Sequence, residues 1–317
     1  MRAYIFRRLI AMPIMLLAMS FFLFLLLFIR PGNAAFAVSG GFNEQGPRSV
    51  AFEHSLGLDR PWYTQYGDWL WHAVRGDLGN ALKPPRHSVS SQIMERIGNT
   101  AEIGLLTILL SALIGIVVGV ISAVKRNSAI DYGLRLLTII GISVPSFWTA
   151  TLLVTLSSKY WGVTPGLTTN YETLFGNPIE NLKIVIWPAL ILSISSAAYI
   201  ARIVRSSMLE TLYSDHVRTA RAKGLQERVV ILRHVLRSSL LTLITVLGLQ
   251  LGTVLGGAVI AEQIFAIPGM GLLTYEAVFA EDYIVVLGAM MVFAAMFLVV
   301  TLVVDITYTF VDPRIRY

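Results

Sequence analysis

Long apolar segments alternate with polar ones along the whole chain. Six of these segments lie at residues 9–29, 101–123, 136–157, 184–203, 239–261 and 284–309. An α-helix needs about 20 apolar residues to cross a hydrocarbon core of about 30 Å. A helix also satisfies its own backbone hydrogen bonds where no water is present. The pattern therefore predicts an all-α, polytopic membrane protein with six transmembrane helices.

The first apolar segment follows three basic residues, Arg2, Arg7 and Arg8. A cleavable signal sequence is the alternative here, and Ala35-Phe36-Ala37 is similar to a small-residue cleavage site. A signal sequence, however, has an apolar core of only about 7–15 residues. We therefore expect the segment to be a retained membrane helix.

Residues 30–100 are polar enough to lie outside the membrane. Asp59 followed by Pro61 is typical of a helix start. The helix that follows would place aromatic and apolar residues on one face, namely Trp62, Tyr66, Trp69 and Leu70. Such aromatic residues favour the membrane–water interface, which predicts a helix on the outer surface. Docking of a soluble partner is the alternative.

The distribution of basic residues predicts the orientation. With the N-terminus inside, the inner segments carry 16 Lys and Arg residues and the outer segments carry 9. Seven of those 9 lie in the long first loop, which the positive-inside rule discounts. We therefore expect a multi-pass chain in a cell membrane with both termini in the cytoplasm. The sequence shows no convincing internal repeat, which disfavours an inverted-repeat secondary transporter.

Composition supports a membrane location. The chain is 55% hydrophobic and 14% charged, with a formal net charge of +6, and its mean hydropathy is +0.68. Because the basic residues cluster beside apolar segments, membrane orientation explains them better than a nucleic-acid partner does. Membrane lipid is therefore an expected partner of the chain. The absence of cysteine excludes disulfides, thiolate metal sites and cysteine catalysis.

A polar segment, Tyr213–Arg237, lies between two apolar ones and holds six of the 25 basic residues. Ser214 and Asp215 are favourable N-cap residues, and Gly224 suits the left-handed position after a helix. A short helix over Asp215–Lys223 is therefore expected. A second helix would begin near Glu227, with Val229, Leu232, Leu236 and Leu240 on one face. A basic loop that only fixes topology is the alternative.

Small and polar residues within the apolar segments suggest packing faces and a pathway. The small residues recur every four positions, as Ser111, Gly115 and Gly119 in one segment and Gly248, Gly252 and Gly256 in another. Such faces let helices approach closely in lipid. The possible pathway or ion-pair residues are Gln250, Asp305 and Arg202, with Arg205 as an alternative partner for Asp305.

The order of residues in 217–225, VRTARAKGL, followed by Arg233-His234, resembles the cytoplasmic signature of ABC-importer permeases. It is most similar to the oligopeptide/dipeptide/nickel-type branch, because the general motif has Glu where Arg218 stands. Leu56–Pro61, Gly76–Gly79 and Pro268–Gly271 also resemble that branch. The resemblance extends from the first apolar segment to the last residues and is silent on the substrate.

The resemblance implies a type I ABC importer permease fold and a location in the inner membrane. It implies a first helix with an extracytoplasmic region (1–95), a five-helix transmembrane domain (96–310) with a cytoplasmic coupling helix at about 214–224, and a cytoplasmic tail (311–317). The residues that would couple to the ATPase are Asp215, Arg218, Thr219, Ala220, Lys223, Gly224 and Leu225. The implied partners are a second permease subunit, two ABC ATPase subunits and an extracytoplasmic solute-binding protein. ATP and Mg would be bound by the ATPase subunits.

The chemistry of an enzyme is missing from the sequence. No G-x-x-x-x-G-K-[ST] motif and no H-E-x-x-H motif occurs, and all five histidines lie outside the apolar segments. We therefore expect no catalytic, cofactor or metal site, and ATP hydrolysis on partner subunits. An ATP-independent channel or secondary carrier, and a structural membrane anchor of a complex, remain as alternatives.

Overall fold

The computed structural model describes residues 2–28, 60–83, 85–167 and 171–311. Helices dominate these residues, which contain no β-strand and only an isolated bridge between Asn80 and Ser88. The predicted all-α class is confirmed. The chain forms two compact units: unit 1 contains residues 101–267 and the segment from 299, and unit 2 contains residues 2–100 and 268–298.

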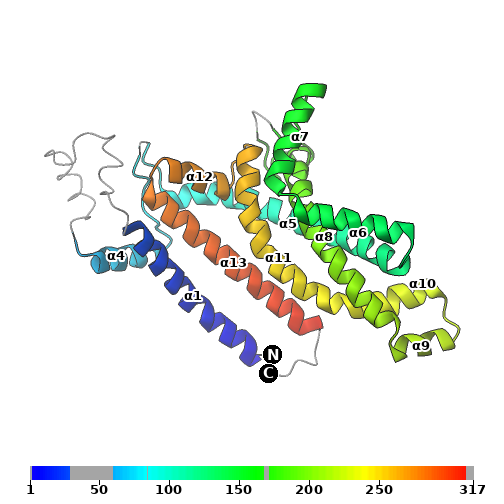
Figure 1. Ribbon diagram of the computed structural model, residues 1–317. Helices are drawn as coiled ribbons and strands as arrows, with labels where there is room; N and C mark the ends of the chain where they lie inside the picture. The colour runs from blue at the N-terminus through cyan, green and yellow to red at the C-terminus, as the bar shows by residue number, and fades with distance from the viewer. Residues whose placement is uncertain (1, 29–59, 84, 168–170, 312–317) are drawn as a thin grey trace. The chain divides into compact units, whose positions relative to one another are not determined.

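Figure 1 shows the order of the helices. They are α1 (Arg2–Phe28), α4 (Trp62–Val74), α5 (Val89–Val124), α6 (Ala129–Ser143), α7 (Ser146–Trp161), α8 (Pro178–Leu212), α9 (Asp215–Ala222), α10 (Glu227–Val229), the π-helical turn η1 (Val230–Val235), α11 (Leu236–Ile264), α12 (Met270–Phe279) and α13 (Tyr283–Val311). Among the described residues, five helices are long and apolar enough to cross a bilayer, or six if α6 and α7 form one span.

The predicted span 136–157 is not one helix. α6 and α7 meet at an angle of 94°, and Val144 between them has extended backbone angles, φ −85° and ψ 122°. Proline explains the break, because Pro145 has no backbone N–H and its ring disfavours helical angles at the residue before it. The prediction from the apolar pattern alone therefore treated as one span two helices that point in different directions.

Unit 1 is built around α8, which contacts α6, α7 and α11. Buried residues are spread along this helix from Asn181 to Met208. Near its C-terminal end, Ile200, Val204 and Met208 share one apolar cluster with residues of α9 and η1. α8 therefore connects the centre of unit 1 directly to α9.

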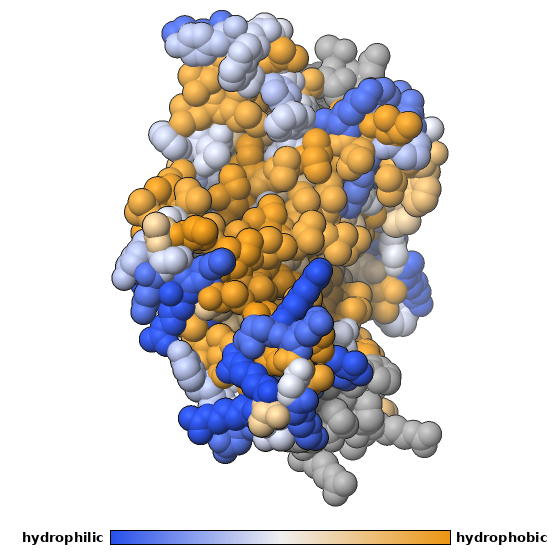
Figure 2. Space-filling model, turned by 90° about the vertical axis from the view of Figure 1, so that its right-hand side faces the viewer, coloured by the Kyte–Doolittle hydropathy of each residue, from blue (hydrophilic) through white to orange (hydrophobic). Residues whose placement is uncertain are grey.

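The outer face of unit 1 is apolar. Exposed large apolar residues on α6 include Ile130, Leu136, Leu137, Ile139 and Ile140. Figure 2 shows a broad apolar band across the face that it displays, with hydrophilic residues gathered beneath it. Exposed apolar surface of this extent is expected of helices in contact with lipid.

Unit 2 contains the helix predicted for the outer surface. α4 begins at Trp62 after Pro61, whereas Asp59 lies outside the described residues. Tyr66 on α4 packs against Phe21 and Phe24 of α1, with ring centroids 5.6 Å and 5.4 Å apart. Its hydroxyl also lies 2.9 Å from the Ser20 hydroxyl. The aromatic face of α4 therefore packs against α1.

The segment predicted as a connection at 262–283 contains a further helix, α12. Its N-terminus is held to α5 within unit 2, because the Met270 N–H donates to the Thr100 hydroxyl at 2.8 Å. The Asn99 amide also donates to the Pro268 carbonyl at 2.8 Å. At the start of α13, buried Asp282 accepts a hydrogen bond from the Leu82 N–H at 2.8 Å. These bonds fix the polar ends of short elements whose backbone groups would otherwise lack partners.

Candidate functional site: the α9 helix and its supports

α9 begins directly after α8, but not with the cap that the sequence predicts. Ser214 occupies the N-cap position with extended backbone, yet its hydroxyl makes no capping bond. Instead it donates to the Thr211 carbonyl at 2.6 Å, which closes the end of α8. Asp215 lies in the first turn of α9, where a carboxylate is favoured by the helix dipole. The predicted capping by the side chains of Ser214 and Asp215 is therefore wrong, although the helix starts where expected.

The C-terminal end of α9 agrees with the prediction. Gly224 has a φ of 75°, in the left-handed region. Its N–H donates to the Arg221 carbonyl at 2.9 Å, and the Leu225 N–H donates to the Ala220 carbonyl at 3.4 Å. These two bonds form a Schellman motif, which satisfies carbonyls at the end of a helix. The helix ends at Ala222 with Lys223 as the C-cap, one residue before the expected end.

One face of α9 is buried against the rest of unit 1. Val217 is 0% exposed and Ala220 is 6% exposed. Both belong to the apolar cluster that contains Met208 of α8 and Val230 and Val235 of η1. The opposite face is polar and exposed: Arg218, Thr219, Arg221, Ala222 and Lys223 all lie on the surface. α9 is thus an amphipathic helix that lies past the end of α8 (Figure 1) and presents cations to its surroundings.

An ion pair closes the loop after α9. The Arg221 guanidinium donates to both carboxylate oxygens of Glu227, from Nε at 3.1 Å and from Nη2 at 2.7 Å. These hydrogen bonds hold the pKa of the Glu227 carboxyl below its ordinary value. Because Glu227 begins α10, the pair links α9 to the helix that follows it.

Burial along the helix after α9 does not follow the apolar face at Val229, Leu232, Leu236 and Leu240 that the sequence predicts. Val229 and Leu232 are 37% and 48% exposed. Val230 and Val235, five residues apart, are fully buried instead. The cause is the π-helical turn η1, whose i→i+5 hydrogen bonds add a residue to the turn and so rotate the buried face. The Leu240 side chain lies outside the described residues.

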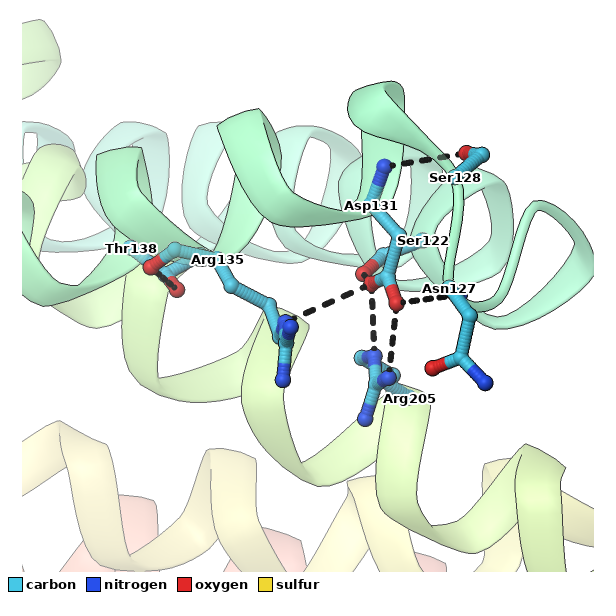
Figure 3. A network of polar contacts seen from close by, with 7 residues as sticks. All are labelled: Ser122, Asn127, Ser128, Asp131, Arg135, Thr138 and Arg205. Carbon is cyan, nitrogen blue, oxygen red and sulfur yellow. Dashed lines mark hydrogen bonds and ion pairs between the residues drawn. The ribbon is translucent and has the colours of Figure 1, made fainter.

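A buried carboxylate, Asp131, holds three helices together beside α8 (Figure 3). It lies in the first turn of α6 and is 0% exposed. Arg205 of α8 donates to it from Nε and from Nη2, both at 2.9 Å. Ser122 of α5 donates to it at 2.5 Å, and the Asn127 backbone N–H donates at 3.0 Å. We call this arrangement of Asp131, Arg205, Ser122 and Asn127 the clamp.

Sequence reasoning missed Asp131. A signal was present, because Ser128 and Asp131 form an S-x-x-D pattern before an apolar run, which is typical of a helix start. The Asp131 N–H indeed donates to the Ser128 hydroxyl at 3.3 Å. Such a pattern explains the cap but not the ion pair. The partner, Arg205, lies 74 positions along the chain and becomes visible only in the fold.

The predicted ion pair of Asp305 stays a prediction. Asp305 is part of α13, but its side chain lies outside the described residues. Arg202 is exposed, and its guanidinium lies 5.2 Å from the centroid of the Tyr199 ring. Arg205, the alternative partner for Asp305, pairs with Asp131. Gln250 is half-buried in α11, and its pathway role is likewise untested.

The small residues of α5 lie against α8. A Cβ added to Gly115 would lie 2.6 Å from Ile200 Cγ2 and 2.8 Å from the Ala197 carbonyl oxygen. A Cβ on Gly119 would lie 2.8 Å from the Ala201 carbonyl oxygen. Glycine is thus needed at both positions for the two backbones to approach so closely.

The polar member of the same face, Ser111, is 1% exposed. Its hydroxyl hydrogen bonds to the Thr107 carbonyl at 2.6 Å and to the Ser193 carbonyl of α8 at 3.4 Å. Ser111 therefore lies at the contact of α5 with α8, where its hydroxyl is satisfied by backbone oxygens.

The glycine series of α11 is less uniform. A Cβ on Gly248 would lie 2.5 Å from Val304 Cγ1 of α13, whereas a Cβ on Gly256 meets no described atom of this chain within 4 Å. Gly252 is half-buried. Within the described chain, close packing therefore applies at Gly248, and the packing role of Gly252 and Gly256 stays a prediction.

A second buried polar group joins α5 to α8 at the other end of unit 1. The Asn181 amide is 0% exposed. It donates to the Glu102 carboxylate at 3.3 Å, the Tyr171 hydroxyl at 3.4 Å and the Glu172 carbonyl at 3.0 Å. Burial raises the pKa of the Tyr171 hydroxyl, and nearby carboxylates, first that of Glu102, raise it further. The sequence analysis did not single out these residues.

The bilayer-length apolar helices define a multi-spanning membrane protein, and the amphipathic helix α9 lies beyond the end of α8. Residues 115–317 match the family described as binding-protein-dependent transport system inner membrane component. Residues 1–100 match the N-terminal family of the same membrane components. The chain therefore belongs to this family and is a multi-pass inner-membrane permease subunit of a binding-protein-dependent transport system.

Relatives match the chain over its full length. It is 41% identical to a Brucella suis biovar 1 protein whose name assigns it to peptide permeases, covering 100% of this chain and 99% of that protein. It is 38% identical to the oligopeptide transport system permease protein AppB of Bacillus subtilis, covering 100% of both chains. It is also 34% identical to the dipeptide transport system permease protein DppB of Alkalihalophilus pseudofirmus, covering 100% of both.

Solved structures confirm the fold. A chain of the MetNI methionine ABC transporter in an inward-facing conformation has a TM-score of 0.58 and 16% identity, covering 70% of this chain and 96% of that one. A chain of an amino acid ABC transporter with histidines has a TM-score of 0.52 and 14% identity, covering 71% and 95%. The predicted type I ABC importer permease fold is therefore confirmed. The family is one of transport components, in agreement with the prediction that this chain is not an enzyme.

Proposed function

We propose that this chain is one of two permease subunits of an ATP-driven importer for peptides, and that α9 transmits force from an ATPase subunit to the spans. The relatives named as peptide, dipeptide and oligopeptide permeases support the substrate class. The observation that carries the proposal is the structure of α9. It is a short helix with one apolar face buried in the permease and one cationic face exposed.

α9 is suited to transmit force because three features hold it rigidly. Val217 and Ala220 attach it to the same apolar cluster as Met208 of α8. The Schellman motif at Gly224 closes its C-terminal end, and the Arg221–Glu227 pair holds the following loop. A movement imposed on the exposed face is therefore passed to α8 instead of being absorbed by unwinding of α9.

The proposed assembly places α9 in the cytoplasm. The excess of basic residues in the inner segments supports an orientation with both termini inside. Two ABC ATPase subunits, which hold ATP and Mg, would contact α9 and its counterpart on the second permease subunit. A solute-binding protein would deliver the peptide from outside, and alternating access would release it to the cytoplasm.

The experiment that tests the proposal replaces Gly224 by valine. No atom lies within 4 Å of a Cβ at Gly224, so the variant meets open space, but its φ of +75° is strained for valine by about 1–2 kcal/mol. The strain loosens the end of α9 without touching any span. We expect normal membrane yield, with reduced recovery of the co-purified ATPase and reduced peptide uptake.

Gly162→Val is the matched control. Gly162 is also a left-handed glycine at the end of a helix, α7, with φ +65° and no atom within 4 Å of the added Cβ. It carries the same backbone strain away from α9, so ATPase recovery should stay normal. Normal recovery and uptake in Gly224→Val would refute the proposal. That result would favour the alternative in which the basic segment only fixes topology, as in an ATP-independent carrier or a structural anchor.

A further inference from the structure

We propose that Asp131 and Arg205 are positioning residues, which make α6 move together with α8 and α9. Force that enters at α9 would then reach the spans through α6 as well as through α8. This inference rests on the proposed function of α9. It adds a route for the movement that neither the family nor the names of the relatives describe.

The clamp has the geometry of a rigid connection. Two parallel hydrogen bonds of 2.9 Å join Arg205 to Asp131. A fork of this kind fixes direction as well as distance, because the guanidinium is planar and both its donors are engaged. Asp131 is 0% exposed and Arg205 is 20% exposed, so water competes little for these bonds. Ser122 ties the C-terminal part of α5 to the same carboxylate.

A second contact joins the same two parts of the chain. Arg126, in the turn between α5 and α6, donates to the Tyr213 hydroxyl at 3.1 Å. Tyr213 is the C-cap of α8, two residues before α9 begins at Asp215. The start of α6 and the turn before it are therefore connected to α8 at two places, at Arg205 along the side of α8 and at Tyr213 at its end. Two such points restrain rotation of α6 about either one.

The turn itself is shaped by the clamp. Asn127 has a φ of 62°, which is uncommon for a residue other than glycine. Its N–H donates to Asp131 Oδ2 at 3.0 Å. A strained residue persists where its surroundings determine its conformation. Asp131 therefore holds the backbone conformation of the turn and also binds Arg205, so the turn and the clamp are expected to move together.

α6 can carry the movement to a defined point. It is 15 residues long and begins at the clamp. It ends at Val144, where the chain turns through 94° into α7. A helix held firmly at one end acts as an arm, and the break at its other end is where the direction of movement changes. Buried ion pairs in general add little net stability compared with apolar residues, so a geometric role explains this one better.

The first test compares two variants at the same carboxylate. Asp131→Asn keeps the size of the side chain but removes the charge that holds the fork. Arg135→Gln is the matched control. Arg135 Nε lies 3.8 Å from Asp131 Oδ1, but Arg135 lies on α6 itself and cannot tie α6 to α8. The measurement is peptide imported per ATP hydrolysed by the assembled complex in proteoliposomes, with the amount of bound ATPase determined on the same sample.

We expect Asp131→Asn to lower the peptide imported per ATP by about tenfold, within the usual range of coupling between sites. Bound ATPase should remain within about twofold of wild type. Arg135→Gln should leave the ratio unchanged. A merely structural role would reduce the number of complexes without changing the ratio for each complex. An unchanged ratio in Asp131→Asn would therefore overturn the inference.

The second test does not depend on whether Asp131→Asn assembles. Because the chain has no cysteine, Asp131→Cys and Arg205→Cys can be combined in one variant, and the two thiols can be joined by a short cross-linker that a dithiol reagent cleaves. The peptide imported per ATP hydrolysed is measured before and after cleavage in one preparation, with wild type treated identically. A high value that falls about tenfold on cleavage supports the inference. An equal ratio before and after cleavage overturns it.

Failure of this inference is distinguishable from failure of the proposed function. If wild type binds no ATPase, or if ATP does not drive its peptide uptake, the proposed function of α9 is wrong. If wild type couples ATP hydrolysis to uptake and Asp131→Asn couples equally well, only the role of the clamp is wrong.

Discussion

Replacement of Gly115 by alanine tests the packing of α5 on α8. The added Cβ would lie 2.6 Å from Ile200 Cγ2, 2.7 Å from Ile200 Cβ and 2.8 Å from the Ala197 carbonyl oxygen. Carbon atoms in contact normally lie about 3.5–4.0 Å apart. α5 and α8 would therefore have to separate locally by about 1 Å. A backbone oxygen cannot rotate away as the end of a long side chain can, so the helices themselves must shift.

Overpacking of this kind costs about 1–3 kcal/mol. Alanine is also a better helix former than glycine by about 1 kcal/mol, which opposes the loss. Gly104→Ala, on the same helix, separates the two effects, because a Cβ there has no atom within 4 Å. The difference between the two variants should be about 2 kcal/mol, or about 4–8 °C in Tm for a domain of about 200 residues.

The assay heats the purified complex in mild detergent and follows the fraction that stays monodisperse on size-exclusion chromatography. Gly115→Ala should lose half of this fraction at a temperature about 4–8 °C below Gly104→Ala. Equal midpoints would refute the reasoning, because they would show that α8 moves aside at no cost. Gly119→Ala should behave like Gly115→Ala, since its Cβ also meets a carbonyl oxygen, that of Ala201, at 2.8 Å.

Two further predictions concern topology and pH. Single cysteines at Lys125 and Gln226 should react with an impermeant thiol reagent only from the cytoplasmic side, and one at Phe175, which is 96% exposed, only from outside. The opposite pattern at Gln226 would contradict the proposed orientation. Because the pKa of Glu227 is lowered, its bond to Arg221 is fully present above the ordinary glutamate pKa and is lost as pH falls through the lowered value. The difference in Tm between wild type and Glu227→Gln should therefore persist just below the ordinary pKa of glutamate and vanish in stronger acid. A difference that already vanishes at the ordinary pKa would show that the Arg221–Glu227 pair does not form.

The sequence predicted features that depend on neighbouring residues. The left-handed conformation of Gly224 follows from a local rule, and its φ of 75° agrees. The apolar segments likewise predicted the class of fold, because hydropathy in a membrane is a property of each segment by itself. The sequence contains Pro145 at the 94° break, but the apolar residues on both sides of it led to the prediction of one continuous span.

Features that depend on tertiary structure could not be predicted. The π-helical turn at Val230–Val235 moves the buried face, and no residue type specifies it. Asp131 and Arg205 meet only because α6 packs on α8. Arg205 was considered as a partner for Asp305 because both lie near the ends of predicted spans, and sequence position does not show which helices are neighbours. Prediction was thus reliable for the apolar segments and for the glycine that ends α9, and it failed for contacts between helices.

The length of α8 determines how a soluble partner can approach. Its 35 residues rise about 52 Å at about 1.5 Å per residue. The hydrocarbon core is about 30 Å thick, and even the full bilayer with its headgroups measures only about 40–45 Å. With a tilt of about 20°, α8 still extends beyond the lipid surface. In the proposed orientation, the residues of α8 that follow the predicted span 184–203 would carry α9 beyond the headgroups, so that a partner bound there need not dehydrate or recognise any lipid.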